Sequence, residues 1–226
     1  TYDGQGHTIS NLYINRPSTS YVGLFGCTQS ASISNLGIVD AEITGSDYVG
    51  GLVGYSYSST ISDSYVTGDV SGSYLVGGLV GYADYNSTIS NSYATGAVSG
   101  NDIVGGLVGY ADYNSTISKT YATGAVSGYY NVGGLVGYNS SSTINNSFWD
   151  IETSGQTTSQ GGSGKTSLEM KSLSTYLNAG WDFVGEEING SEDIWYIHPN
   201  VNSGYPSFAN AQTTLEYVPN YALVVY

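Results

Sequence analysis

Asp84 and Asp112 are two residues whose type and spacing in this sequence could support metal binding. Asp84 and Asp112 lie 28 positions apart, each within the phrase Tyr-Ala-Asp-Tyr-Asn. Their carboxylates, with the neighbouring amides of Asn86 and Asn114, are the oxygen ligands that calcium prefers. Because both aspartates are copies of one repeat position, a solvated acidic ladder is the simpler interpretation. A weak calcium site at Asp84 and Asp112 is the alternative.

Other catalytic and cofactor-binding patterns are incomplete. His7 and His198 are the only histidines, and neither has a metal-ligand spacing to Cys or acidic residues. The phrase Gly-x-Ser-x-Gly of a nucleophile elbow is absent. Residues 162–166 (Gly-Ser-Gly-Lys-Thr) lack the first glycine of a phosphate-binding loop, where Ser159 stands. We therefore predict no catalytic residue, no enzymatic activity and no cofactor beyond the calcium alternative.

Several asparagines match the acceptor pattern for N-glycosylation. They are Asn86, Asn114, Asn139, Asn145 and Asn189. The first two recur at the repeat period, so sugars there would line one edge of the protein. Such patterns also arise by chance in a chain rich in Asn and Ser, so an unmodified chain is the alternative.

The charge balance excludes whole classes of partner. The chain of 226 residues has 4 Lys+Arg against 18 Asp+Glu, for a net charge of −14. Nucleic-acid binding needs a basic surface, and so does binding to anionic membranes. No apolar run is long enough to span a membrane. The sequence starts at Thr1 without Met or a signal-peptide pattern, so we expect either a processed mature protein or a fragment. Cys27 is the only cysteine, so an intrachain disulfide is impossible.

A repeated phrase defines the elements that position these residues. Val-Gly-Gly-Leu-Val-Gly-Tyr occurs at residues 49–55, 76–82, 104–110 and 132–138, with a period of 27 or 28. A period of this length is typical of stacked-repeat proteins. An isoleucine phrase recurs with it, and its column is Ile9, Ile33, Ile61, Ile89, Ile117 and Ile144.

Each unit contains three short β-branched or apolar pieces separated by Gly, Ser, Asn and Asp, which is strand-and-turn chemistry. We predict an all-β fold: a β-solenoid of about six coils over residues 1–150, roughly 28 Å long at the ordinary strand spacing. Val49 and Leu52 cannot both point inward on an unbroken strand, so a bend is predicted at Gly50-Gly51.

Tyrosines recur in two columns at the same period. One holds Tyr65, Tyr93 and Tyr121, and the other holds Tyr82, Tyr110 and Tyr138. We expect at least one column to be buried core. An exposed column would suit sugar stacking or subunit contact.

These phrases resemble the GLUG repeat of secreted bacterial and archaeal surface proteins. The resemblance rests on the Gly-Leu-Val-Gly cores, which are followed by Ser-Thr-Ile-Ser-Asn-Ser-Tyr-Ala-Thr-Gly. The segments 148–150 (Phe-Trp-Asp), 164–166, 169–170, 180–183 and 204–206 resemble the module that often closes such arrays. The resemblance covers about residues 20–208. It implies an extracellular, often adhesin-like protein with no shared catalytic residues.

The C-terminal part is predicted to cap the solenoid. Residues 151–165 read as a flexible polar loop. Thr166 and Glu169 then form a capping box, which predicts one short helix running to about Leu177. Leu168, Leu173 and Leu177 are expected to pack on the last coil. Residues 151–212 would thus be a capping module that covers the open end.

The final segment, residues 213–226, is apolar and rich in β-forming residues. One interpretation is that it folds back along its own solenoid. The other is strand addition to a neighbouring subunit, which would give a head-to-tail polymer. The residues expected to make that contact are Leu215, Tyr217, Val218, Tyr221, Leu223, Val224, Val225 and Tyr226.

Two functions are consistent with these features. The first is a non-enzymatic extracellular structural or adhesive protein, a subunit of a self-assembling surface filament. The alternative is a cell-surface carbohydrate-binding or carbohydrate-processing β-helix, with glycans or other surface proteins as partners. For that alternative, Trp149, Trp181 and Trp195 are the first residues to test.

Overall fold

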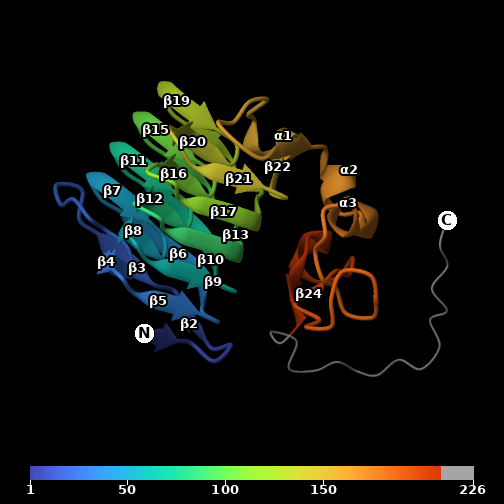
Figure 1. Cartoon of the computed structure of the whole chain (residues 1–226). Coiled ribbons are helices and arrows are strands. Elements are labelled where there is room, and N and C mark those ends of the chain that lie inside the picture. Colours follow the sequence, from blue (N-terminus) through green and yellow to red (C-terminus); the bar gives the residue numbers. More distant parts are fainter. Residues whose placement is uncertain (210–226) are drawn as a thin grey trace.

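The computed structural model describes residues 1–209, and the final segment 213–226 with its predicted assembly residues lies outside that range. Residues 1–150 wind into a solenoid of stacked coils with parallel strands (Figure 1). The all-β solenoid with repeats of about 28 residues is therefore confirmed.

Three parallel sheets form the sides of the solenoid. The first contains β7 (Asp47–Gly50), β11 (Tyr74–Gly77), β15 (Asp102–Gly105) and β19 (Tyr130–Gly133). The second contains β4 (Phe25–Gln29), β8 (Val53–Tyr57), β12 (Val80–Asp84), β16 (Val108–Ala111) and β20 (Val136–Asn139). The third contains β1 (Tyr2–Asp3), β2 (Thr8–Ser10), β3 (Tyr13–Asn15), β5 (Ser32–Ser34), β6 (Gly37–Thr44), β9 (Thr60–Ser62), β10 (Tyr65–Ser71), β13 (Thr88–Ala94), β14 (Val98–Ser99), β17 (Thr116–Ala122), β18 (Val126–Ser127), β21 (Thr143–Asn145), β22 (Phe148–Asp150) and β23 (Ser163–Lys165).

The register of the isoleucine column corrects the number of coils. Ile33 pairs with Ile61 on one side and with Tyr2 on the other. Ile9 instead pairs with Ile38, in the column that continues through Val66. The phrase around Ile9 therefore occupies a different side of the first coil, and the solenoid has about five turns rather than six.

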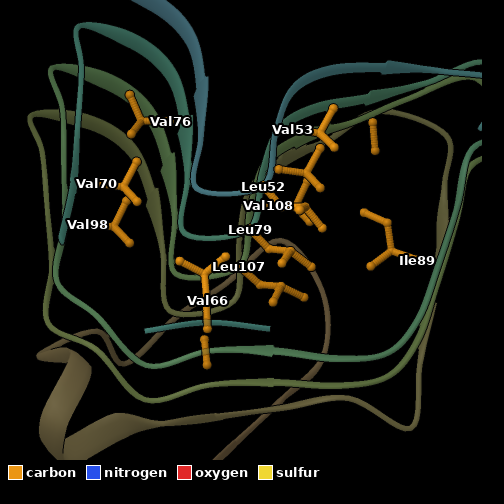
Figure 2. Close-up of a cluster of buried hydrophobic side chains, with 14 of the residues drawn as sticks. Leu52, Val53, Val66, Val70, Val76, Leu79, Ile89, Val98, Leu107 and Val108 are labelled. Carbon is orange, nitrogen blue, oxygen red and sulfur yellow. The ribbon is translucent and has the colours of Figure 1, made fainter. Parts of the chain in front are cut away.

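Apolar ladders fill the interior. Leu52, Leu79 and Leu107 are fully buried and lie in a row, between Val53 and Ile89 on one side and Val70 and Val98 on the other (Figure 2). Val49 and Leu52 both point inward because the chain bends between β7 and β8, as predicted. A methyl group on Gly50 would collide with the Val53 carbonyl, so only glycine fits this bend.

Residues 151–165 cover the last coil, and the prediction of a flexible loop was wrong. Helix α1 (Ile151–Ser154) begins at Asp150, whose carboxylate accepts hydrogen bonds from two backbone N–H groups. Gly134 then donates to Thr158 O, and Gln160 donates to Val136 O. Strand β23 pairs with β22. Several backbone groups of the last coil thus find partners within the same chain.

The C-terminal module contains α2 (Ser167–Met170), α3 (Leu173–Leu177), β24 (Trp195–Tyr196), the 3₁₀ turn η1 (Asn202–Gly204) and β25 (Ser207–Phe208). The capping box of Thr166 and Glu169 is confirmed. The single helix is split at Lys171 and Ser172, where α3 starts with Ser172 as its N-cap. Leu168 was expected to pack inward but is 82% exposed.

The module lies along the side of the solenoid rather than over its end (Figure 1). Its apolar core joins Trp181, Trp195 and Phe208 to the tyrosine column of the third sheet. The Trp181 indole N–H also donates to Asn146 O at 2.8 Å. Within the predicted capping module of residues 151–212, residues 151–165 cover the end of the solenoid, and the described residues that follow pack along its side. Among residues 1–209, none of the helices has the length and apolar character of a membrane-spanning segment.

Candidate functional site

The predicted acidic pair lies where β12 and β16 end: Asp84 is the last residue of β12, and Asp112 directly follows β16. Asp84 and Asp112 are only 9% and 7% exposed, so a solvated ladder is not what these side chains form. The Tyr55 hydroxyl donates to Asp84 Oδ2 at 2.6 Å, and the Tyr110 hydroxyl donates to Asp112 Oδ2 at 2.9 Å. The two carboxylates and these tyrosines make one hydrogen-bonded face, which we call the Tyr–Asp face.

The Tyr–Asp face shifts several pKa values. Burial and the hydrogen bond to Asp84 raise the pKa of Tyr55, and burial and Asp112 raise the pKa of Tyr110 to about 12. Burial opposes ionisation of Asp112. Hydrogen bonds from the Tyr113 N–H, Tyr110 and Ser141 outweigh it and hold the pKa of that carboxyl below its ordinary value. In the folded protein both aspartates thus accept hydrogen bonds from tyrosine hydroxyls.

These contacts leave little of either carboxylate for a metal ion. Asp112 Oδ1 accepts from Tyr113 N at 2.7 Å and from the Ser141 hydroxyl at 3.1 Å. Within residues 1–209 only Asp84 Oδ1 of the pair has no hydrogen-bond partner. The described residues contain no group of three or more His, Cys, Asp or Glu side chains placed to hold a metal ion. The calcium site at Asp84 and Asp112 stays a prediction.

Partly exposed tyrosines stack face to face between successive coils. Tyr82 and Tyr110 have ring centroids 4.7 Å apart with planes 7° from parallel. Tyr57 and Tyr85 are 5.2 Å apart at 4°. In each pair, one face of each ring is covered by its neighbour. A sugar ring stacks on an open aromatic face, so stacking within the pair reduces the surface that these tyrosines offer to a sugar.

The other tyrosine column is buried core, as expected for one of the two. Tyr93 and Tyr121 are covered by Trp195 and Phe208 of the C-terminal module. Trp149, Trp181 and Trp195 are themselves buried, so they offer no surface to a glycan. The proposal to test them first for sugar binding was therefore wrong, although the carbohydrate alternative itself stays a prediction.

The glycosylation acceptors differ in accessibility. The Asn189 amide donates to Leu177 O and Trp181 O, and Asn139 closes a turn with Ser142. Sugar on either nitrogen would break those bonds. The remaining acceptors are exposed: Asn86, Asn114 and Asn145. Glycosylation is thus sterically compatible with the fold at three of the five positions.

Two other sequence features turn out to be structural. The Gly162–Thr166 phrase contributes β23, whose Ser163 N–H donates to Ser147 O, so that N–H is not free to bind phosphate. Cys27 is exposed and lies in register with Tyr55, so it occupies the position that tyrosine holds in the later coils.

The first coil presents a second candidate surface, at the N-terminal end of the solenoid. Within residues 1–209, each of β1, β2, β3 and β4 pairs with a strand on one side only. A groove of about 380 Å³ lies there, and its lining includes Tyr13, Ile14, Arg16 and Tyr21. Its apolar residues are partly exposed, with Tyr13 at 62%. We call this surface the N-terminal face.

Comparison with known proteins confirms the resemblance. Residues 45–71, 72–99 and 100–127 match the family model described as the GLUG motif, so three tandem GLUG repeats are present. Halomucin of Haloquadratum walsbyi is 45% identical over 67 residues, which are 29% of this chain and 1% of halomucin. A "Putative Gly-rich membrane protein" of Evansella cellulosilytica is 42% identical over 59 residues, which are 26% of this chain and 7% of that protein. The chain spans a small part of the length of both relatives.

A solved structure has the same architecture. It is a "putative immunoglobulin A1 protease" from Bacteroides ovatus, with a TM-score of 0.59 over 93% of this chain and 77% of that one. Its sequence is 16% identical to this chain. The similarity therefore concerns the fold alone.

Proposed function

We propose that this protein is a non-enzymatic, extracellular structural subunit of the cell surface that assembles end to end. A surface location is supported by the GLUG repeats and by relatives whose names denote a mucin and a membrane protein.

The observation that carries the proposal is the difference between the two ends. The last coil is covered in part by residues 155–165, which hydrogen-bond to the Gly134 N–H and to the Val136 and Ser147 carbonyls and supply β23 as a partner for β22. The N-terminal face keeps one unpaired edge on each of its four strands. Unpaired edges accept an added strand. In a second copy, residues 155–165 lie over part of the last coil, so they stand in the way of direct coil-on-coil stacking on this face.

The segment at residues 213–226 is suited to fill the face instead. It is rich in the β-branched and aromatic residues that favour strands. Its single charge, Glu216, complements Arg16 in the groove of the N-terminal face. Pro219 restricts the segment to an edge position, which is what an added outer strand occupies. Donation from one copy to the next is a heterologous contact that does not close, and it would produce a filament.

Electron microscopy of the purified chain tests this assignment. We expect filaments from the full chain and single short rods from a chain that ends at residue 212. The shortened chain keeps the accepting face but cannot donate. Added to the full chain, it should bind filament ends and shorten the filaments in proportion to its amount.

Two variants distinguish the proposed contact from general stickiness. Arg16→Glu should weaken assembly by repelling Glu216, and Glu216→Arg in the same chain should restore it. Leu168→Asp changes an exposed apolar residue of the C-terminal module and should leave filaments unchanged. Single rods from the full chain at high protein concentration would contradict the proposal.

A further inference from the structure

We propose that the exposed tyrosine stacks are sites of oxidative coupling, in which tyrosines of adjacent coils become joined by a carbon–carbon bond. Two stacks combine near-parallel rings with one exposed ring. Tyr57 and Tyr85 are 5.2 Å apart at 4°, and Tyr21 and Tyr48 are 4.6 Å apart at 10°. In near-parallel rings at this separation, the ortho carbons of one phenol lie against those of the other. This modification does not depend on filament assembly.

The backbone holds both pairs at this separation before any reaction. Tyr57 lies in register with Asp84, the residue before Tyr85, and Ser58 N–H donates to Asp84 O at 3.2 Å. Tyr21 N–H donates to Asp47 O at 2.8 Å, next to Tyr48. Reacting groups fixed in this way combine much faster than free ones, because no encounter is needed.

Both stacks are open to a reagent in solution. Tyr85 is 48% exposed and Tyr21 is 49% exposed. An oxidant can therefore reach one ring of each pair, and the partner ring lies in van der Waals range of the radical formed there.

The reaction needs a peroxide as oxidant, activated by a haem peroxidase. Each phenol loses one electron and one proton to give a tyrosyl radical, and the two radicals form a bond between their ortho carbons. The two ring hydrogens then move through solvent to the phenolic oxygens, which restores aromaticity. The two electrons and two protons that leave the tyrosines reduce one hydrogen peroxide to two waters.

The buried tyrosine column provides an internal control. Tyr65 and Tyr93 are 4.8 Å apart at 10°, and Tyr93 and Tyr121 are 4.9 Å apart at 10°. Their geometry matches that of the exposed stacks, but the C-terminal module covers them. The exposed stacks and the buried column therefore differ in access to the oxidant and not in ring spacing. The buried column should not couple in the folded protein.

The test treats the full chain with hydrogen peroxide and peroxidase, and then maps cross-linked peptides by mass spectrometry. A mixture of ¹⁴N- and ¹⁵N-labelled chains distinguishes bonds within a chain from bonds between chains. We expect linked peptides lighter by two hydrogen atoms, of single isotope, for Tyr57–Tyr85 and Tyr21–Tyr48. Tyr85→Phe keeps the ring stack but should abolish the first link and leave the second. Tyr113→Phe, a change of an exposed tyrosine one repeat further on, should leave both.

Three results would overturn the proposal. One is the absence of both links at peroxide levels that oxidise the exposed tyrosines. Another is a Tyr57–Tyr85 product of mixed isotope only, which would mean that coupling occurs between chains. The third is equal coupling of Tyr93–Tyr121 while circular dichroism shows a folded chain. Burial under the C-terminal module would then not protect a tyrosine pair from coupling.

Discussion

The Tyr205 hydroxyl donates a hydrogen bond of 2.7 Å to Asp150 Oδ2 across 55 residues of sequence. Asp150 is the last residue of the solenoid and the N-cap of α1, and it is fully buried. The Ser167 hydroxyl donates to the same oxygen at 2.6 Å. One carboxylate thus joins the end of the solenoid, the covering segment and the C-terminal module.

Tyr205→Phe should destabilise the fold by about 1–3 kcal/mol, because a buried carboxylate oxygen loses a donor. Urea unfolding measures the loss. Tyr129→Phe removes a hydroxyl from a side chain that is 81% exposed and should change stability by less than about 0.5 kcal/mol. Equal effects of the two changes would contradict the role of Asp150.

Acid should destabilise the protein through the same carboxylate. Burial raises the pKa of Asp150, but hydrogen bonds from Ser167, Tyr205 and two N–H groups outweigh it and hold the pKa below 3.8. Because the folded pKa lies below the unfolded one, this stabilisation is present above pH of about 4 and is lost as pH falls through the folded pKa. Asp150→Asn should be less stable at neutral pH and should flatten that part of the pH–stability curve.

Alkali should act through the tyrosines. Burial raises the pKa of Tyr93, Tyr121 and Tyr176 well above 10.0. A raised folded pKa gives stability that is full below the unfolded pKa of about 10 and declines as pH rises beyond it. Ultraviolet titration should therefore show one tyrosine class ionising near pH 10 and another ionising only with unfolding. A single class near pH 10 in a folded chain would contradict burial of the column.

The inner ladder should be sensitive to single truncations. Leu107→Ala leaves a cavity between fully buried Leu79 and Leu135, so a loss of about 2–5 kcal/mol is expected by thermal or urea unfolding. Leu168→Ala is the matched control, because that side chain is 82% exposed. Similar losses at the two sites would contradict the ladder arrangement.

Replacing a glycine at the bend even by alanine should destabilise the fold. A methyl on Gly105 would meet the Val108 carbonyl and the backbone of the next coil at Gly137, so Gly105→Ala should cost about 1–3 kcal/mol. Gly185→Ala meets no atom within 4 Å, and its cost arises only from a φ of +84°. Comparing both by calorimetry separates crowding from backbone strain.

The sequence predicts the parts of this fold that depend on periodicity. Identical residues at a fixed period must stack, which gives the solenoid, the bend at Gly50 and a buried tyrosine column, although not which of the two columns is buried. The register of Ile9 could not be predicted in the same way, because Ile9 and Ile33 share a phrase but differ in the surrounding spacing. The place of the C-terminal module depends on contacts such as Tyr121 with Trp195, which no local pattern contains.

The candidate site was predicted less well for a similar reason. Asp84 and Asp112 were found by their spacing, but their hydroxyl donors come from different positions: Tyr55 lies on the preceding coil and Tyr110 two residues before its aspartate. Asp150 belongs to the Phe-Trp-Asp segment that resembles the closing module, but that resemblance did not indicate its hydrogen bonds to Ser167 and Tyr205.

The C-terminal module packs along a column that runs through Tyr65, Tyr93, Tyr121 and Phe148, and so it braces consecutive coils from the side. The first coil has no such brace among the described residues. Under tension along the chain, this coil should peel away first and at low force, while the braced coils resist until the module is pulled off. The first coil would thus be mechanically weaker than the braced coils. Single-molecule stretching would show a small early extension before one large rupture.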